Sequence, residues 1–399
     1  MRESMDVTDI VIVGGIRTPM GKFGGALKDM AAYDLGAAAI SGVLKKTGLP
    51  GKVIDDVILG SCRQAGNGPN PSRTAAVRGG IPETVPVLTL NMACPSGMRA
   101  LALASQAIRL GEAQVVLVGG FDSMSTIPYL LKDARWQGFK MGDKVLLDGW
   151  NDSIDPLCNL GMGETAENLA EKYQISRREQ DEFAASSQQK ASRAQDEGWF
   201  DEEIVPISVP QPKGDPLAFG RDETIRRDTT VDRLMKLPPV FRKDGSITAG
   251  NACLMSDGAV ALVVASRSKA KDLGLKPLFS LVSYAQSAVD PRFMGEGPAV
   301  TIPLALNKAK MTLADVDFIE VNEAFAAQVL ANERILKWDR ERLNVHGGAI
   351  ALGHPTGISG ARILLTLYHI LRLHDGETGV AGICGGGGVS MAAVIRREG

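Results

Sequence analysis

The stretch CPSGMRA, Cys94–Ala100, is echoed by HPTGISGA, His354–Ala361, much later in the chain. In both, a reactive side chain is followed by Pro, then by Ser or Thr, then by Gly. Each stretch lies between a strand-like run and a long apolar run typical of a buried helix. We therefore predict that Cys94 and His354 occupy the same position in two copies of one structural unit.

The surrounding sequence repeats in the same order. Asp55 precedes Cys94 by 39 residues, and Asp317 precedes His354 by 37. A strand that begins with Gly-Glu follows each apolar helix, as GEAQVVLVGG at 111–120 and GETGVAGICGG at 376–386. Blocks that recur in one order at similar spacing indicate an internal duplication. Since there are only two copies, we expect a fused pair of halves rather than a solenoid.

Short β-branched runs ended by Gly alternate with apolar helical runs, which indicates an α/β fold with crossover connections. The stretch from about 121 to 250 breaks this pattern, because it is richer in Asp, Lys, Arg and Trp. It holds a helix that we expect to be exposed, with a capping box formed by Ser176 and Glu179. We predict a first half at 1–122 plus 252–275, an inserted loop domain at 123–251, and a second half at 276–399.

The bulk composition argues against several function classes. The 399 residues include 44 basic and 46 acidic ones, so there is no basic surplus of the kind that binds nucleic acid. Apolar runs end well before the ~20 residues that a membrane span needs, and the first ten residues lack the apolar core of a signal peptide. Five scattered cysteines without a C-x-x-C pair argue against disulfides and a zinc site. We expect a cytoplasmic protein that binds no nucleic acid, membrane or metal.

The repeat suggests a chemical reason for pairing Cys94 with His354. Pro at the next position suits the first turn of a helix, so both residues are expected at helix N-termini. Such a terminus stabilises an anion and should lower the pKa of the Cys94 thiol from ~8.5 toward neutral, while His354 takes the proton. Pseudo-symmetry would bring both helix starts to one central point, so we predict that the two side chains meet.

Two further residues end strands in the second half. Cys384 closes the strand that follows the His354 helix, and Gly385–Gly388 come next. A backbone bare of side chains can aim N–H groups at a developing oxyanion. Asn322 ends the run VDFIEVN and is expected to open the helix EAFAAQVLANERIL, where Asn is also a common structural cap.

The remaining cysteines and histidines receive structural interpretations. His369 and His374 lie at the end of a helix, where a positive charge is favourable. His346, in NVHGGAIALGHP, is left undecided. Three cysteines are interpreted as small buried hydrophobes, the usual state of a lone cysteine: Cys62, Cys158 and Cys253.

Nearly the whole chain resembles the thiolases, which are acyl-CoA C-acyltransferases. The matching stretches, in the family's order, are GGIRTPMGKFGGAL, NPSRTAAVRGGIP, NMACPSGMRA, MGETAEN, ITAGNACLMSDGA, VNEAFAAQ, NVHGGAIALGHPTGISGAR and CGGGGV. The resemblance implies a duplicated βαβαβαββ unit in five αβαβα layers with an inserted loop domain.

The resemblance also implies roles for the reactive residues. Cys94 would be the nucleophile that becomes acylated, and His354 would take its proton and later polarise the thioester carbonyl. Asn322 would hold a water beside His354 in one oxyanion hole, and the N–H groups of Cys94 and Gly386 would form the second. Cys384 would move the α-proton of the acetyl group. The implied reaction is CoA-dependent thiolytic cleavage of a 3-oxoacyl-CoA, and the reverse Claisen condensation, in lipid metabolism such as β-oxidation.

Coenzyme A is implied as a substrate, and no permanently bound cofactor is expected. The inserted domain would bind it, with Arg226 at the nucleotide end and Phe241 and Ala249 along the pantetheine arm. Three further residues are expected in this binding site: Cys253, Met162 and Met294. The family also implies a homodimer or tetramer, and some relatives work with an accessory subunit.

Several positions depart from the family pattern. Gly161 stands where many members have His, Cys253 replaces a serine that contacts pantetheine, and Ser390 replaces a glycine. Thr356 and Ile358 differ from the usual HP(I/L)GASG. Because the acyl pocket and pantetheine tunnel differ, we expect a longer or unusual 3-oxoacyl-CoA rather than acetoacetyl-CoA.

Three other functions are weighed against this one. A biosynthetic acetyl-CoA C-acetyltransferase is the first alternative. A 3-ketoacyl synthase that works on a carrier protein would lack the second cysteine, so Cys384 argues against it. A non-catalytic thiolase-fold subunit of a larger acyl-CoA complex would have lost Cys94, His354 or Cys384, and none is lost.

Overall fold

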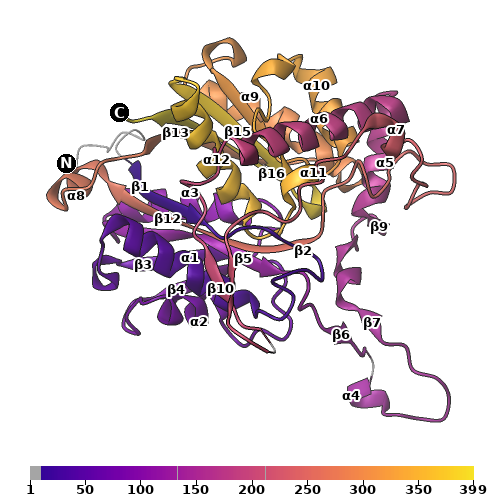
Figure 1. Ribbon diagram of the computed structural model, residues 1–399, viewed down its shortest axis with the longest axis horizontal. Helices are drawn as coiled ribbons and strands as arrows, with labels where there is room; N and C mark the ends of the chain where they lie inside the picture. Colours follow the sequence, from indigo (N-terminus) through magenta and orange to yellow (C-terminus); the bar gives the residue numbers. More distant parts are fainter. Residues whose placement is uncertain (1–9, 133, 212) are drawn as a thin grey trace.

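A ten-stranded sheet forms the core of the protein in a computed structural model, which describes residues 10–132, 134–211 and 213–399 (Figure 1). From one edge, the second half of the chain supplies β14 (Phe318–Val321), β15 (Thr378–Cys384), β16 (Val389–Arg397) and β13 (Phe279–Ala288). The first half continues with β1 (Ile10–Arg17), β12 (Ser256–Ser266), β5 (Val115–Ser123), β3 (Asp56–Gly60) and β4 (Val87–Leu90), and β2 (Gly21–Lys22) pairs with β12. The halves join where β1 pairs antiparallel with β13.

Outward from that joint, the two halves have the same strand order. The order β1-β12-β5-β3-β4 in one matches β13-β16-β15-β14 in the other. The pair β3–β5 is parallel, as is its counterpart β14–β15. The counterpart of β4 is reduced to one parallel bridge between Ile319 and Leu343. The predicted α/β class and internal duplication are confirmed.

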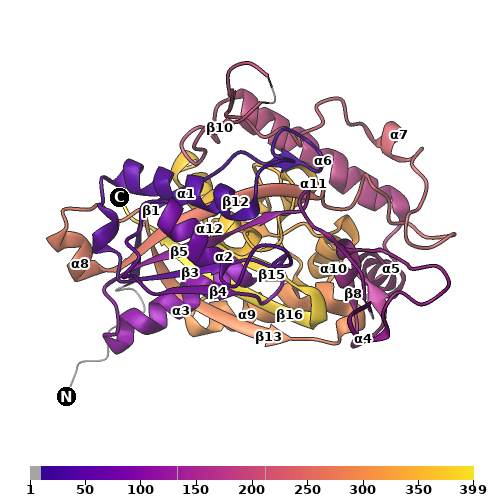
Figure 2. The ribbon, with the colours of Figure 1, turned by 90° about the horizontal axis from the view of Figure 1, so that it is seen from below.

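The chain between β5 and β12 leaves the sheet and forms the inserted segment. Its elements are β6 (Tyr129–Leu130), α4 (Ala134–Gln137), β7 (Leu147–Asp148), β8 (Ile154–Asp155), β9 (Leu160–Gly161), α5 (Met162–Lys172), α6 (Arg177–Asp196), β10 (Ile207–Val209), β11 (Leu217–Phe219) and α7 (Val231–Leu234). Figure 2 shows α6 and α7 along one side of the two halves. After the insertion the chain returns to the sheet as β12, which pairs with β5 and β1. The boundaries proposed for three domains stay a prediction, and residues 1–9 of the first lie outside the described ranges.

Helix α6 differs from its prediction in one respect. The capping box is confirmed, since Ser176 Oγ accepts from the Glu179 N–H and Glu179 accepts from the Ser176 N–H. The expected exposure is wrong for one face, where nine residues are buried. The reason is that α6 packs against α10 (Ala326–Leu336) and α11 (Ala349–Leu352) of the second half.

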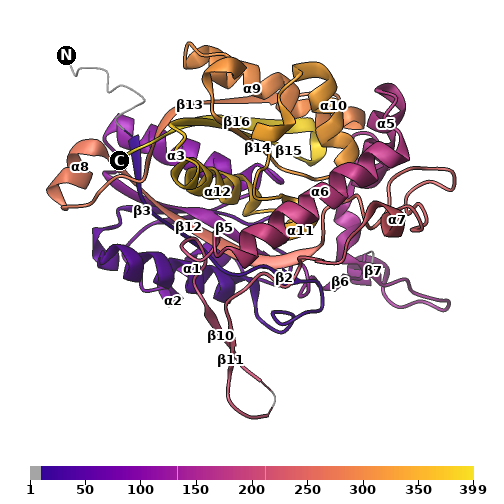
Figure 3. The same cartoon turned by 45° about the horizontal axis from the view of Figure 1, so that its top comes forward.

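The remaining helices form three layers around the two sheet halves (Figure 3). Outer helices α1 (Ala32–Thr47) and α2 (Pro71–Arg78) cover the first half, and α9 (Gly297–Lys308) and α10 cover the second. Helices α3 (Ser96–Leu110) and α12 (Ser359–Leu373) share the central core between the halves. This gives the expected five αβαβα layers. The other short elements are α8 (Arg267–Asp272) and 3₁₀ turns at Gly51–Val53, Gly149–Ser153, Pro291–Glu296, Leu313–Asp315, Arg340–Arg342 and Gly386–Gly388. No helix in the described ranges is long and apolar enough to cross a membrane.

The two central helices touch at their first turns. A Cβ added to Gly97 of α3 would lie 2.8 Å from the backbone nitrogen of Ala361 in α12. A Cβ added to Gly360 of α12 would lie 2.6 Å from the backbone nitrogen of Met98 in α3. Since real Cβ atoms do not approach backbone that closely, glycine at both positions allows the crossing.

The helix register corrects the predicted equivalence of Cys94 and His354. Both central helices have 15 residues and open with Ser-Gly-x-Arg, so Ser96 matches Ser359. In that register Cys94 matches Gly357, and His354 lies three residues further from its helix. The duplication is real, but the two reactive residues are not the same position in its copies. His354 lies instead in the loop between α11 and α12, where its N–H donates to the Leu254 carbonyl at 2.9 Å.

Candidate active site

Cys94 and His354 meet between the two halves. Cys94 lies in the turn from β4 to α3, directly after Ala93, whose φ of 51° is left-handed. His354 lies in the loop between α11 and α12, and its backbone N–H donates to the Leu254 carbonyl at 2.9 Å. His354 Nε2 is 3.1 Å from Cys94 Sγ. The predicted meeting of these side chains, 260 residues apart in the chain, is confirmed.

Ser359 sets the orientation of the imidazole. Its hydroxyl lies 2.6 Å from His354 Nδ1 and donates its own hydrogen to the Pro355 carbonyl at 3.2 Å. A hydroxyl whose hydrogen is used in this way accepts from the ring, so Nδ1 carries the proton. Nε2 then presents a lone pair to the Cys94 thiol. Burial lowers the pKa of His354 to about 3, so the ring is neutral at physiological pH and can act as a base.

The electrostatic prediction for Cys94 is wrong. Neither reactive residue is the first residue of a helix, since α3 begins at Ser96 and α12 at Ser359. Burial raises the pKa of the Cys94 thiol, and the Cys384 and Cys253 thiols raise it further. The charge of Arg63 and the N–H of Gly386 oppose this rise without reversing it. Cys94 therefore rests as a thiol beside a neutral base, and its proton must move during the reaction.

Two neighbouring thiols raise the pKa of Cys94, those of Cys384 and Cys253. Cys384 ends β15 and is 1% exposed, and burial raises its pKa to about 12. Cys253 lies in the loop before β12, donates its N–H to the Ala324 carbonyl at 3.0 Å, and has its pKa raised by burial to about 12. Cys158 lies in the turn between β8 and β9. The structure therefore brings Cys94, Cys253 and Cys384 together and leaves Cys158 in the inserted segment.

The glycine run after Cys384 faces the nucleophile. The N–H of Gly386 is directed at the Cys94 sulfur, where it favours the thiolate. The next N–H, of Gly387, donates to Asp155 Oδ2 at 3.0 Å, so the buried Asp155 holds the run in place. Met162 lies beside this run, because a Cβ added to Gly386 would be 3.4 Å from its sulfur. The geometry fits an oxyanion hole that uses a backbone donor.

Asn322 is buried at the end of β14. Its N–H donates to the Gly382 carbonyl at 3.0 Å, and within the described ranges neither atom of its side-chain amide has a partner. The expectation that Asn322 opens a helix is wrong, because α10 begins at Ala326 with Phe325 as its N-cap. The intervening residues form a tight turn, in which the Ala324 N–H donates to the Asn322 carbonyl at 3.1 Å. A buried amide without protein partners is suited to hold a water.

The residues expected along coenzyme A fall into two groups. Met162, Met294 and Cys384 share one apolar cluster with Phe325. Phe241 joins this cluster edge-on, with its ring centroid 6.2 Å from that of Phe325. Two others are exposed and lie outside the cluster: Arg226 and Ala249.

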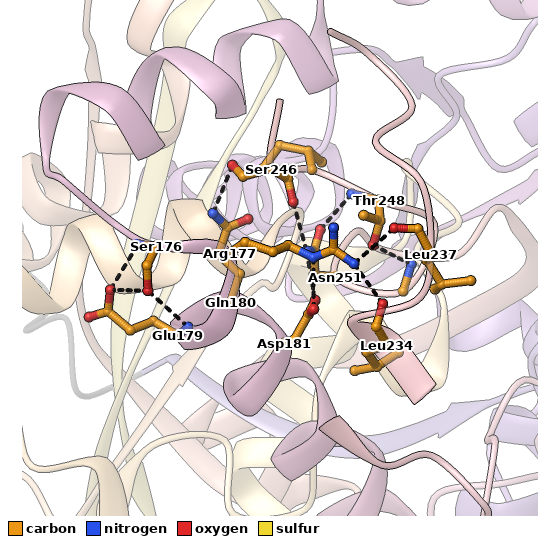
Figure 4. Close-up of polar contacts among 12 residues, drawn as sticks. Ser176, Arg177, Glu179, Gln180, Asp181, Leu234, Leu237, Ser246, Thr248 and Asn251 are labelled. Carbon is orange, nitrogen blue, oxygen red and sulfur yellow. Dashed lines mark hydrogen bonds and ion pairs between the residues drawn. The ribbon is translucent and has the colours of Figure 1, made fainter. Parts of the chain in front are cut away.

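A buried polar network holds the loop that carries Ala249 and Cys253 (Figure 4). Arg177 Nη2 donates to the Leu234 and Leu237 carbonyls, and its Nε donates to Asp181 at 2.7 Å. Asp181 also accepts from the Asn251 amide at 2.9 Å. Helix α6 therefore fixes this loop from one side, which explains why its inner face is buried.

Sequence reasoning missed several neighbours of the reactive pair. Cys62, interpreted as an inert hydrophobe, donates its thiol to the Ala93 carbonyl at 3.2 Å, next to Cys94. Cys62 follows β3, which pairs in parallel with the strand leading to Cys94. Because carboxyl ends of parallel strands meet at one sheet edge, this strand order was the signal that could have found it. The other residues missed are Arg63, Asp122, Asp155 and Ser359.

The other histidines lie apart from the reactive pair. His346 Nε2 is 3.0 Å from His374 Nε2, and the His346 ring lies 4.6 Å from the Trp199 ring. The expected positive charge on His369 and His374 is wrong, because burial lowers both pKa values, that of His369 to about 3. Among the described residues, no group of three or more His, Cys, Asp or Glu side chains could hold a metal ion.

Two departures from the family pattern have local explanations. Ser390 is buried in the sheet, donates to the Ile383 carbonyl at 3.0 Å and accepts from Thr301 Oγ1 at 2.5 Å. Gly161 is the N-cap of α5, and its N–H donates to Glu164 Oε2 at 2.7 Å. A Cβ added to Gly161 would lie 3.4 Å from Glu164 Oε2, which is ordinary contact.

Comparison with known proteins agrees with the fold. The model of the thiolase N-terminal domain matches residues 10–268, and that of the C-terminal domain matches 275–397. A probable acetyl-CoA acyltransferase of Staphylococcus aureus is 50% identical over 98% of this chain and 100% of its own length.

Solved structures agree over the same length. The Bacillus anthracis acetyl-CoA acetyltransferase has a TM-score of 0.95 at 44% identity, covering 97% of this chain and 98% of its own. Human mitochondrial 3-ketoacyl-CoA thiolase in complex with CoA has a TM-score of 0.93 at 43% identity, covering 98% of both chains. This chain therefore belongs to the thiolase family of CoA-dependent acyltransferases.

Proposed function

We propose that this enzyme cleaves 3-oxoacyl-CoA with coenzyme A through an acyl intermediate on Cys94, and that it also catalyses the reverse condensation. The observation that carries the proposal is the 3.1 Å contact between His354 Nε2 and Cys94 Sγ, with a second thiol, Cys384, in the same cluster of sulfurs. A nucleophile, a base and a separate proton carrier are the groups that this chemistry requires.

In the first half-reaction, His354 Nε2 takes the Cys94 proton and the sulfur attacks the 3-oxo carbonyl. The N–H groups of Cys94 and Gly386 stabilise the resulting alkoxide. Collapse breaks the C2–C3 bond, leaves the acyl group on Cys94 and releases the enolate of acetyl-CoA. His354 and a water on Asn322 stabilise the enolate oxygen, and Cys384 donates its proton to C2. A thiol whose pKa is raised to about 12 remains protonated until so basic a carbon forms.

In the second half-reaction, the Cys384 thiolate takes the proton of the coenzyme A thiol. The new thiolate attacks the acyl-Cys94 carbonyl, and the acyl group leaves as acyl-CoA. Cys94 regains its proton from His354, so all three enzyme groups return to their starting protonation states, and the proton of the coenzyme A thiol replaces the one that Cys384 gave to C2. The sum is 3-oxoacyl-CoA plus CoA giving acetyl-CoA plus a shortened acyl-CoA.

The substrate proposal rests on the residues around the sulfurs. We place the pantetheine arm beside Phe241, Ala249, Met162, Met294 and Cys253, with Arg226 near the nucleotide. Gly161 has no side chain where many relatives carry an imidazole, which favours a 3-oxoacyl chain longer than acetoacetyl. The CoA complex of a similar human thiolase supports coenzyme A as the substrate thiol. The named alternative is a biosynthetic acetyl-CoA acetyltransferase, in keeping with the similar Bacillus anthracis protein.

We place the enzyme in the cytoplasm as a homodimer or tetramer, where an accessory subunit could also bind, and we assign it to fatty-acid degradation. The edge strand β4 ends the sheet and is only half-buried, a setting in which a second copy can add its own strand. The β6–β7 excursion extends away from the two halves (Figure 1). It carries exposed large apolar side chains, including Trp136 at 91% exposure, which suit a further contact between copies.

Two variants test the mechanism, using a panel of 3-oxoacyl-CoA esters from acetoacetyl to long chains. Cys94→Ala should abolish all acyl transfer. Cys384→Ala should still acquire an acyl group on Cys94 from acyl-CoA, seen as a mass increase of the Cys94 peptide, but should not make or break the carbon–carbon bond. Normal thiolysis by Cys384→Ala would refute its assignment. A preference for acetyl-CoA condensation over every longer ester would favour the biosynthetic alternative.

A further inference from the structure

Asp122 joins the two loops that carry the reactive pair. It lies near the end of β5, and its side chain is fully buried. Oδ1 accepts from the loop after β3, where the donors are Ser61 Oγ at 3.3 Å, the Cys62 N–H at 3.0 Å and the Arg63 N–H at 3.1 Å. Oδ2 accepts from the His354 loop, where the donors are Thr356 Oγ1 at 2.9 Å and the Gly357 N–H at 2.6 Å. We call Asp122 with these five donors the Asp122 clamp.

Each side of the clamp leads to one member of the reactive pair. On one side, Cys62 donates its thiol to the carbonyl of Ala93, the residue before Cys94. On the other, Thr356 and Gly357 lie in the turn that connects His354 to Ser359, the hydroxyl that orients its ring. The Asp122 clamp therefore spans the gap between a loop of the first half and a loop of the second.

The backbones around this carboxylate are packed too closely to adjust. A Cβ added to Gly60 would lie 2.5 Å from the Gly357 carbonyl oxygen, and one added to Gly120 would lie 2.4 Å from it. The strand ends of β3 and β5 and the His354 loop thus meet at three glycines. A change in the hydrogen bonds of Asp122 would move backbone rather than flexible side chains.

A carboxylate is the group that this arrangement requires. Three of the donors are backbone N–H groups, which cannot accept, and they face both oxygens. An amide at this position would present its NH₂ to one loop and its oxygen to the other, so one loop would meet donor against donor. Asp122→Asn therefore has to release one of the two loops.

We propose that Asp122 is a positioning residue, whose ionised carboxylate holds the Cys94 and His354 loops in register so that Nε2 stays within reach of the thiol. Thr356 is part of this device, which gives a reason for its hydroxyl where the family usually has Ile or Leu. The role in turnover rests on the proposed function, but the role in the reactivity of Cys94 does not. A loop shift of about 1 Å can lower a rate roughly 100-fold.

The test measures alkylation of Cys94 by iodoacetamide from pH 6 to 9.5, resolved by peptide mass spectrometry. We expect Asp122→Asn to slow alkylation at pH 8 by roughly 10- to 100-fold, as His354→Ala should. Thr356→Val removes one donor without changing the side-chain shape, so it should fold and slow alkylation by roughly 2- to 5-fold.

Asp257→Asn is the matched control. Asp257 is also buried, on the neighbouring strand β12, but its carboxylate accepts from Ser123 and Ser125 and not from either reactive loop. Its alkylation profile should stay within about twofold of the native one. An unchanged profile in Thr356→Val, and in Asp122→Asn if that variant folds, overturns the proposal. If the native enzyme turns over no 3-oxoacyl-CoA, the proposed function fails while alkylation still decides the clamp.

Discussion

Arg63 acts on both members of the reactive pair through its charge. The guanidinium lowers the pKa of the Cys94 thiol and also that of the His354 imidazole. It is held at the site by the Trp150 ring, 4.6 Å from its central carbon, and by a 2.7 Å bond from Nη2 to Ser153 Oγ. A fixed positive charge favours the thiolate, and it keeps the neighbouring base neutral until a proton arrives.

Replacing Arg63 by Met should raise the pKa of Cys94 and of His354 together. The backbone N–H that belongs to the Asp122 clamp is unchanged, so the loops should stay in place. We expect alkylation of Cys94 at pH 7.5 to be roughly 3- to 10-fold slower, which corresponds to a rise in the thiol pKa of about 0.5 to 1 unit. Arg99→Met is the control, since that guanidinium bonds Gln286. Equal rates in both variants and the native enzyme would contradict the assignment.

At the scale of single residues, the sequence identified the reactive side chains but not the residues that hold them in position. Cys94, His354 and Cys384 could be singled out because a reactive side chain beside Gly and Pro has few structural explanations. Asp122 and Ser359 could not, because an Asp at a strand end or a Ser in a first helical turn is ordinary. Their importance depends on which loops the fold brings against them. The wrong pKa direction for Cys94 has the same origin, since burial is a property of the assembled halves.

Helices α3 and α12 are the elements that set the distance between the two reactive loops. Their glycines Gly97 and Gly360 lie where each helix backbone touches the other. In an isolated helix, Gly→Ala stabilises by ~1 kcal/mol. Here we expect Gly97→Ala and Gly360→Ala to destabilise the enzyme by about 1–3 kcal/mol, because the added carbon meets rigid backbone. The sign of the change therefore separates helix propensity from packing at the crossing.

Urea unfolding at fixed protein concentration measures this change, with Gly42→Ala as the control. Gly42 lies in α1, and the three atoms nearest to a Cβ there would all belong to the side chain of Val205, the closest at 3.1 Å. That variant should be neutral or slightly stabilised. Equal stabilisation of all three variants would mean that the central helices have room to separate.

At the scale of elements, periodicity predicted α1, α3 and α12 well because their apolar residues and terminal glycines are local signals. Gly48 and Gly111 end α1 and α3 in the left-handed conformation expected of such caps. The start of α10 and the register of the repeat were missed. Both depend on loop length, which a pattern of matching tetrapeptides does not measure. The prediction thus brought Cys94 and His354 together by treating them as equivalent positions of the repeat, although they differ by three positions when the two central helices are aligned.

Across the whole molecule, buried titratable groups accumulate where the halves and the inserted segment meet. Burial lowers the pKa of His346, His354 and His369 to about 3 and raises that of Glu320 to about 8. The histidines bind protons in the unfolded chain below pH ~6.5 but not in the fold, so their contribution to stability is present above that pH and is lost as pH falls toward 3. Glu320 acts in the opposite sense, since its stabilising effect is lost as pH rises from ~4.5 to 8. Burial also raises the pKa values of Asp122, Asp257 and Glu323, so these carboxyl groups act with Glu320 against the histidines, and a histidine variant is needed to isolate the histidine contribution.

His369 offers the cleanest test of this balance. It lies in α12 away from the reactive pair, and within the described ranges neither of its ring nitrogens has a hydrogen-bond partner. Burial is the largest cause of its lowered pKa, and the positive charges of Lys46, Arg372 and Arg17 lower that pKa further. His369→Met removes one titrating group without leaving a polar atom unpaired. Each buried histidine changes the free energy of unfolding by ~1.4 kcal/mol per pH unit below pH ~6.5. The difference in unfolding free energy between His369→Met and the native enzyme should therefore shift by about 2 kcal/mol in favour of the variant between pH 7.5 and pH 5.

Leu371→Met, a buried apolar change on the same helix, is the control, and it should show no such pH-dependent gain in urea unfolding. An identical acid slope in His369→Met and the native enzyme would mean that His369 is already protonated in the fold.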